Sequence, residues 1–457
     1  MSDANDLAQT GRVGHSGTGL EIGRQIGWYP WYVACLLCLA QLVSILDHYL
    51  MSVVLEPIKH DLQVSDSQLG LLTGPSFAIF FAIACIPLGR LADVANRRLI
   101  IVFGIFGWSI ATLLCAFSNS FGTLFAARLG VGLGEAALLP SALSLIAAYF
   151  GIDKQSKGVA IFATGNSLGR AAAFIGGGAM LGLLTTRGGL HVFNTVAFKP
   201  WQGLFFLAGM LGFAVSLACL TIREPRREES ARRGTLSESL SYFWRNGRLY
   251  LQFFLPFALN VATVMAMAGW MVSLYVRQFG LSIAEASALM GTSSLIIGPI
   301  GAALGGWLTD LLIRNGKLGA PPAILAAILT VCAAGALAMP FSRNLWMTAS
   351  LYCVIYLALS CAGPPGYSGV QMITPERHRG LVSSFFLCTY TLVGAGLGPL
   401  VVGIFSDYLF TEDHLAYSLA ATCLVFSLVG VPVALSAIRK FSYTVQEVQN
   451  GRNSEFD

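Results

Sequence analysis

Long apolar stretches separated by short polar segments dominate this chain. An α-helix needs about 20 predominantly apolar residues to cross a bilayer. The stretches that meet this requirement lie near residues 30–54, 68–91, 99–118, 121–150, 157–184, 202–222, 249–276, 285–312, 320–340, 344–373, 380–407 and 414–438. The pattern therefore predicts an all-α membrane protein with twelve transmembrane helices.

Composition supports this prediction. Of the 457 residues, 55% are hydrophobic and 11% are charged, whereas a soluble domain typically carries about 25% charged residues. All ten cysteines fall inside apolar stretches, and the Cys35-x-x-Cys38 spacing has no second ligand pair. We therefore expect packing thiols and no metal site. No H-E-x-x-H, P-loop or nucleophile elbow is present, so we expect neither an enzyme nor a cofactor.

Basic residues predict the orientation, because loops on the cytoplasmic side carry an excess of Lys and Arg. The tails and the loops on their side contain 21 of these residues, and the opposite loops contain 5. Both termini are therefore expected in the cytoplasm, in a multi-pass protein of a bacterial inner membrane. On this interpretation the net charge of +5 reflects topology, and nucleic acid is not an expected partner.

One long polar interruption, after the sixth stretch, divides the chain into two halves. The predicted parts are a cytoplasmic tail (1–27), a six-helix half (28–222), a cytoplasmic linker (223–248), a second six-helix half (249–440) and a cytoplasmic tail (441–457). The halves resemble each other, since the pattern G-x-L-x-D-x-x-x-R begins at Gly89 and again at Gly306. A glycine-rich pair, from Gly165 and from Gly394, supports an internal duplication. Internal repeats with the substrate site between them are a common plan of transporters.

The repeated motif is expected at the cytoplasmic helix ends. Asp93 and Arg97 are four residues apart and can pair with each other or with another helix end. We interpret the motif as a latch of the cytoplasmic gate; the alternative is a solvated charge pair. The predicted gate residues are Gly89, Asp93, Arg97, Asp310 and Arg314. With its repeat, the motif resembles the signature of the major facilitator superfamily, which implies that superfamily's fold of two pseudo-symmetric six-helix halves.

Charged residues within the spans are the most informative positions, because an ionisable group at membrane depth is costly and normally faces the interior or a cavity. The four are Asp47, Arg128, Glu135 and Arg170. Counted along the helices, Asp47 and Arg128 reach one level, which predicts an ion pair. Glu135 is predicted to pair with Arg170 or Arg128.

Carboxylates beside guanidiniums suit proton coupling, because the carboxylate can titrate while arginine keeps its charge. His48 is a further candidate for titration, although a neutral, hydrogen-bonding histidine is the more common case. The alternative for the whole cluster is a static network of buried salt bridges that holds the helices together.

Polar residues in the second half are candidates for a mostly apolar cavity wall, which fits a small amphipathic substrate. Each could equally be a helix-packing residue. They are Asn260, Thr263, Met267, Tyr356, Ser360 and Thr389.

Several segments resemble bacterial spinster-like proteins. They are Leu46-Asp47-His48-Tyr49, the segments 55–62 and 68–74, Arg128-Leu-Gly-Val-Gly-Leu-Gly-Glu135-Ala136, and Thr374-Pro-Glu-Arg-His-Arg-Gly380. The resemblance implies proton-dependent transport of lysophospholipids or sphingoid lipids, with Asp47, Arg128 and Glu135 in coupling and substrate response. The family often has Arg after the first-helix Asp, where this chain has His48, which implies a more pH-sensitive site.

Two alternatives within the superfamily are a proton-coupled organic anion symporter of the hexuronate type and a multidrug/proton antiporter. The anion symporters are similar in the first and fourth helices, and Arg128 or Arg170 could bind a carboxylate. A non-transporting scaffold is disfavoured, since the chain has no sizeable soluble domain. A monomer is expected.

Overall fold

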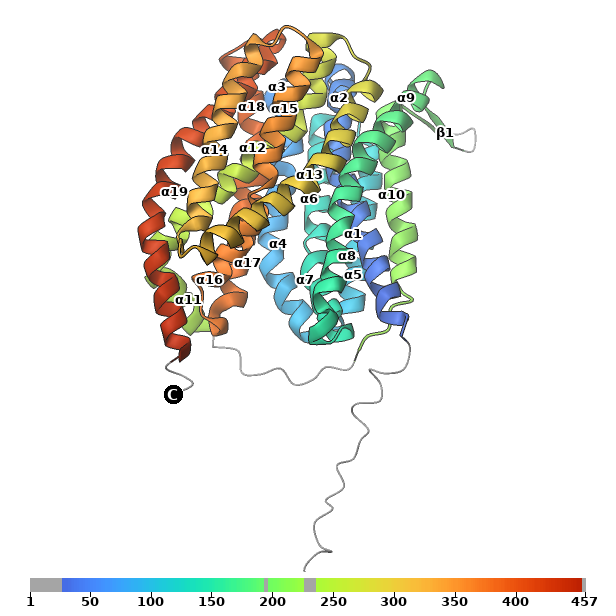
Figure 1. The fold of residues 1–457 in the computed structure, drawn as a ribbon. Coiled ribbons are helices and arrows are strands. Elements are labelled where there is room, and N and C mark those ends of the chain that lie inside the picture. Colours follow the sequence, from blue (N-terminus) through green and yellow to red (C-terminus); the bar gives the residue numbers. More distant parts are fainter. Residues whose placement is uncertain (1–26, 193–195, 226–235, 454–457) are drawn as a thin grey trace, which may run out of the picture.

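The computed structural model describes residues 27–192, 196–225 and 236–453, which form a bundle of long helices (Figure 1). Twelve helical segments are long and apolar enough to cross a membrane. The predicted all-α membrane fold with twelve spans is therefore confirmed.

The first six spans are built from helices and one π-helical segment. Their elements are α1 (Tyr29–Val53), α2 (Leu55–Leu62), α3 (Asp66–Thr73), α4 (Pro75–Val94), α5 (Arg97–Ala116), α6 (Phe121–Glu135), α7 (Leu138–Tyr149), α8 (Ile152–Ala171), η1 (Ala172–Gly177), α9 (Gly178–Thr186) and α10 (Pro200–Cys219). A hairpin of β1 (Leu190–Val192) and β2 (Val196–Phe198) lies between α9 and α10.

The last six spans follow the linker helix α11 (Leu236–Arg245). Their elements are α12 (Gly247–Phe279), α13 (Ile283–Arg314), α14 (Ala320–Ala338), η2 (Met339–Phe341), α15 (Leu345–Ser360), α16 (Gly363–Met372), η3 (Glu376–His378), α17 (Arg379–Thr389), η4 (Tyr390–Ala395), α18 (Gly396–Tyr408), η5 (Glu412–His414) and α19 (Leu415–Asn453).

Three features depart from the predicted plan. The small hairpin adds two strands to a fold expected to be wholly helical. The segment expected as a polar cytoplasmic linker contains α11, whose Phe243 ring stacks on Phe385 at 4.5 Å. Helix α19 continues through Asn453, into the segment expected as a tail. In each case a short segment forms regular structure that the amino-acid composition of the segment does not predict.

Several spans are interrupted close to the predicted buried charges. Helix α6 ends at Glu135, and α7 starts at Leu138. The π-helical segment η1 begins two residues after Arg170, and η4 interrupts the eleventh span in the second half. π-Helical turns are rare in proteins overall but are enriched at functional sites. These interruptions therefore indicate a functional site in the middle of the bundle.

The two halves lie side by side, with blue to green elements in the first and yellow to red elements in the second (Figure 1). The start of α1 and the end of α19 lie at one end of the bundle (Figure 1). We call this the terminal end and the opposite end the distal end. Elements α2, α3 and the end of α18 lie at the distal end (Figure 1), where contacts between the halves are dense.

Candidate functional site

Asp47 lies in α1 and is only 2% exposed. One carboxylate oxygen accepts a hydrogen bond from the Thr112 hydroxyl of α5 at 2.6 Å. The other oxygen, Oδ1, is buried without a hydrogen-bond partner. The carboxylate is therefore held by a neutral hydroxyl and keeps one free acceptor.

Glu135 closes α6 and is 6% exposed. Its Oε2 accepts a hydrogen bond from the Ser44 hydroxyl of α1 at 2.8 Å, while Oε1 has no partner. Ser44 precedes Asp47 by one helical turn, so α1 contributes to both carboxylate sites. The two carboxylates and Arg128 lie within electrostatic range of one another.

Arg128 is fully buried, and all three of its guanidinium nitrogens lack a hydrogen-bond partner among the described residues. It shares the buried face of α6 with Glu135, as their seven-residue spacing predicts. The expected ion pair between Arg128 and Asp47 is not formed: no such pair lies within 4.0 Å in the part of the chain that the structure describes. Asp47 instead uses Thr112, a residue that sequence reasoning missed.

Arg170 also differs from its predicted pairing with Glu135. Its Nη1 donates a hydrogen bond to the Tyr356 hydroxyl of α15, in the other half. The guanidinium lies over the Tyr49 ring at 4.9 Å and over the Tyr356 ring at 5.8 Å. Aromatic faces therefore take the place of the expected carboxylate.

His48 packs edge-on against Phe77 at 4.6 Å and against Tyr49 at 5.2 Å. Its Nδ1 is buried and has no hydrogen-bond partner. The ring lies in the electrostatic field of both Arg128 and Arg170. His48 thus faces α4, as expected of a helix-packing residue, but its Nδ1 lacks the expected hydrogen bond among the described residues.

The predicted cavity residues of the second half have mixed environments. Asn260 is 2% exposed with an unpaired side-chain Nδ2, and Tyr356 contacts Arg170. The Thr263 and Thr389 hydroxyls donate to carbonyls of their own helices. Met267 is buried, and Ser360 packs close to Gly301 of α13. Asn260 and Tyr356 thus stand out, while the other four have the contacts of helix-packing residues.

The gate motif has a different local geometry from the one expected. Asp93 and Arg97 do not share a helix, because α4 ends at Val94 and Asn96 caps α5 by accepting from the Leu99 N–H. Arg97 forms an ion pair with Glu224 at 2.7 Å. The side chain of Asp93 lies outside the described part of the structure, and the backbone of Gly89 lies within α4.

The second copy of the motif is exposed. Asp310 and Arg314 lie at the end of α13. Neither forms an ion pair within 4.0 Å among the described residues. Their proposed role in another conformation stays a prediction.

A network of charged residues joins the halves at the distal end, and sequence reasoning missed it. Asp66, at the start of α3, has a fully buried side chain. Arg277, near the end of α12, donates to both of its oxygens at 2.7 and 2.9 Å. Arg277 also donates from Nε to Glu56 at 2.8 Å. A bidentate pair therefore links the first half to the second.

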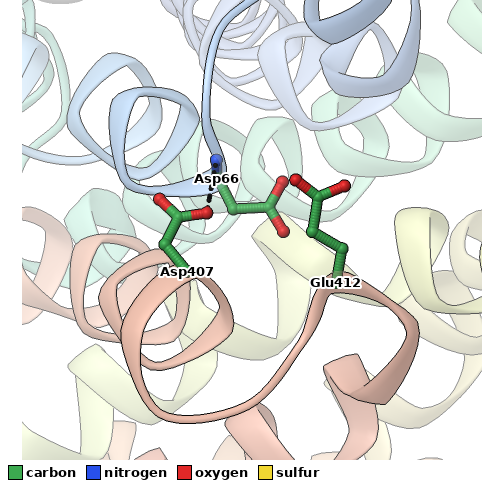
Figure 2. A group of neighbouring side chains, drawn as sticks. All are labelled: Asp66, Asp407 and Glu412. Atoms are coloured by element: carbon green, nitrogen blue, oxygen red, sulfur yellow. Dashed lines mark hydrogen bonds between the residues drawn. The ribbon is translucent and has the colours of Figure 1, made fainter.

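Further groups complete this distal network. Lys59 contacts Asp66 at 2.7 Å and Glu412 at 2.6 Å. Asp407, near the end of α18, accepts from the backbone N–H groups of Asp66 and Ser67 at the start of α3. Figure 2 shows how Asp66, Asp407 and Glu412 face one another across the two halves. A carboxylate at a helix N-terminus is favourable, because the helix dipole and free N–H groups point at it.

Close backbone approach supports the same interface. A side chain at Gly70 of α3 would meet the Pro399 carbonyl of α18 at 2.7 Å, and one at Gly403 would collide with the Asp66 carbonyl. The distal end is thus closed by packing as well as by charge. Lys59 and Arg277 are two of the few basic residues in the distal loops, and that rarity is the sequence signal for this network. From the sequence alone they count only as evidence for the orientation of the chain in the membrane.

Comparisons with known proteins agree with this architecture. A bacterial homologue of the human lysosomal transporter spinster, solved in an inward-facing and unoccupied conformation, superimposes with a TM-score of 0.76 at 23% identity, covering 93% of this chain and 98% of that one. An MFS-type efflux pump of Mycolicibacterium smegmatis is 26% identical over 86% of this chain and 88% of its own length. The hexuronate transporter of Bacillus subtilis is 23% identical over 90% and 98%. The model of the Major Facilitator Superfamily matches residues 37–399, and the chain therefore belongs to this superfamily of membrane transporters.

Proposed function

We propose that this protein is a proton-coupled secondary transporter that carries an amphipathic solute, a lysophospholipid or a sphingoid lipid, by alternating access. The observation that carries the proposal is the set of buried, incompletely paired charges in the middle of the bundle. Among the described residues, Asp47 and Glu135 each have an unpaired oxygen, and Arg128 has three unpaired nitrogens. A static salt-bridge network would pair these atoms with one another.

Incomplete pairing matters because a buried polar atom without a partner costs about 1–3 kcal/mol. Such groups in native structures usually meet protein, water or a ligand in some state. A proton on either carboxylate would remove its charge, and Arg128 would then be free to interact with the other. We propose that Asp47 and Glu135 exchange protons and that Arg128 re-pairs between them.

The surroundings favour a solute with a large apolar part. Tyr49 and Phe77 pack against His48, and Met265 accepts a hydrogen bond from the Tyr49 hydroxyl. Similarity to the bacterial homologue of spinster supports a lipid. The hexuronate transporter supports the alternative, an organic anion symporter, and the efflux pump supports an antiporter.

The closed distal end supports the alternating-access part of the proposal. If the termini are cytoplasmic, as the basic residues indicate, this conformation faces inward. We propose that opening the distal end breaks the Asp66–Arg277 pair and that closing the terminal end engages Asp93, Arg97, Asp310 and Arg314.

The test is transport in proteoliposomes at two pH values, with and without an imposed pH gradient. Oleoyl lysophosphatidylcholine and sphingosine represent the lipids, and galacturonate represents the organic anions. Gradient-driven movement of a lipid supports the main proposal, and movement of galacturonate alone supports the alternative. Movement that is indifferent to pH and to the gradient would contradict proton coupling.

A further inference from the structure

Arg170 carries a half-buried positive charge that no carboxylate of the described residues neutralises. Its Nη1 donates to the Tyr356 hydroxyl, and its guanidinium lies over the Tyr49 and Tyr356 rings at 4.9 and 5.8 Å. Its Nε is buried and has no acceptor in the part of the chain that the structure describes. Within the described residues, no carboxylate lies within 4.0 Å of it. Among the described residues, the neutral phenols of Tyr356, Tyr49 and Tyr352 thus surround this guanidinium in place of a carboxylate.

This environment is weaker than the one a guanidinium prefers. Arginine presents a planar fork of N–H donors that matches a carboxylate or a phosphate with two parallel bonds. Such charge-assisted bonds are roughly twice as strong as hydrogen bonds between neutral groups. An incoming anionic group would therefore compete well with the Tyr356 hydroxyl, while the aromatic faces could remain in place.

A second cation, the buried guanidinium of Arg128, lies in the same neighbourhood, because His48 interacts electrostatically with both Arg128 and Arg170. Among the described residues, all three nitrogens of this guanidinium are unpaired. The middle of the bundle thus offers two sets of unused guanidinium donors. This arrangement favours a ligand with negative charge over a neutral or cationic one.

We propose that Arg170 binds a compact anionic group of the solute, a carboxylate or a phosphate, and that Tyr356 holds this place until the solute displaces it. This inference rests on the proposed transport function and names the chemistry of the solute's head. The phosphate of a single-chain lipid and the carboxylate of a sugar acid share this chemistry.

Displacement of Tyr356 also links binding to the movement of the halves. Arg170 lies in α8 of the first half, and Tyr356 lies in α15 of the second. Gly298 of α13 leaves room for the phenol, since a side chain there would meet the Tyr356 hydroxyl oxygen at 3.2 Å. An anion that takes over Arg170 would break a hydrogen bond between the halves and loosen their central contact.

Binding to the purified full-length protein tests this inference, at one pH and without any gradient. The probes form two matched pairs: oleoyl lysophosphatidate with mono-oleoylglycerol, and galacturonate with galactose. The variants are Tyr356→Phe, which removes only the hydroxyl, and Arg170→Gln. The matched control is Tyr352→Phe, whose ring stacks on Tyr356 at 5.6 Å. Among the described residues the Tyr352 hydroxyl forms no hydrogen bond with Arg170.

We expect wild type to prefer the anionic member of at least one pair. Tyr356→Phe should bind that anion about 3- to 10-fold tighter, because a competing internal hydrogen bond is lost, while binding of its neutral partner stays unchanged. Arg170→Gln should weaken the anion at least about 10-fold. Tyr352→Phe should resemble wild type. Preference for the lysophosphatidate identifies a lipid phosphate as the source of the anion, and preference for galacturonate identifies a carboxylate.

Three results would overturn the inference. The first is a wild type that binds neither anion better than its neutral partner, and the second is an Arg170→Gln variant that keeps the preference for the anion. The third is a Tyr356→Phe variant whose affinity changes by the same factor for the anion and for its neutral partner. Arg170→Lys guards against misfolding, because it keeps the charge but loses the fork and should fall between wild type and Arg170→Gln. Because binding is measured without a gradient, failure of proton coupling would leave these results unaffected.

Discussion

Two clusters of buried charge in this molecule differ in how completely they are paired. At the distal end, the Asp66 carboxylate accepts hydrogen bonds from both terminal nitrogens of Arg277, from the Lys59 ammonium and from the Ser406 hydroxyl. In the middle of the bundle, Asp47 and Glu135 each accept one hydrogen bond from a hydroxyl, and the Arg128 guanidinium donates to no acceptor among the described residues. Complete pairing suits a closed contact between halves, whereas incomplete pairing leaves groups free to titrate or bind.

The largest effect is expected from Arg277→Gln, which breaks the paired cluster. Removing one partner of a buried pair costs about 3–5 kcal/mol, because Asp66 would remain buried with its main partner gone. The equilibrium should shift about 10²- to 10⁴-fold toward an open distal end. Maleimide labelling of Ser287→Cys, which is buried in the contact between α13 and α9, would report the opening.

The control for Arg277→Gln is the double variant with Asp66→Asn. The double variant also removes the unpaired negative charge of Asp66. The extent of maleimide labelling should therefore fall close to that of Ser287→Cys alone. Unchanged labelling in Arg277→Gln itself would mean that packing at Gly70 and Gly403, and not the ion pair, closes the distal end.

The next largest effect is expected from Glu135→Gln, which removes a titratable group from the unpaired cluster. Accumulation driven by a pH gradient should fall at least about 10-fold, as for loss of a proton-transfer group, and transport should lose its pH dependence. Exchange of solute without a gradient should continue. Ser44→Ala, which removes only the hydroxyl that Glu135 accepts from, is the control and should keep coupling. Full coupling in Glu135→Gln would exclude Glu135 from the mechanism.

A smaller effect is expected from Thr112→Val, which keeps the shape but removes the donor to Asp47. The ionised carboxylate loses a hydrogen bond worth about 0.5–1.5 kcal/mol. The pH of half-maximal transport should therefore move upward, by at most about one unit. A pH profile of transport measures the shift. An unchanged or lowered midpoint would count against Asp47 as a proton carrier.

The smallest effect is expected from Glu412→Gln, at the rim of the distal network. Glu412 is 55% exposed where it meets Lys59, and exposed pairs contribute about 0–1 kcal/mol. Labelling of Ser287→Cys should rise at most about fivefold, and the difference should shrink in high salt. An effect as large as that of Arg277→Gln would remove the distinction between buried core and exposed rim.

The fold followed from local information. Apolar length determines which segments can span a bilayer, because unpaired backbone groups are not tolerated there, and all twelve spans were predicted. The rarity of ionisable residues in spans led directly to Asp47, Arg128, Glu135 and Arg170. The repeated motif at Gly89 and Gly306 revealed the two halves before any coordinates.

Only the tertiary structure decided how these residues are paired. Residue counts along helices give depth but not rotation or partner, so Asp47 contacts Thr112 and Arg170 contacts Tyr356 instead of the expected charges. The distal network joins residues of α2 and α3 to residues of α12 and α18 that lie more than 200 positions away in the sequence. In the sequence these residues look like ordinary charged loop residues, because no local pattern indicates which residues of the two halves will pack together.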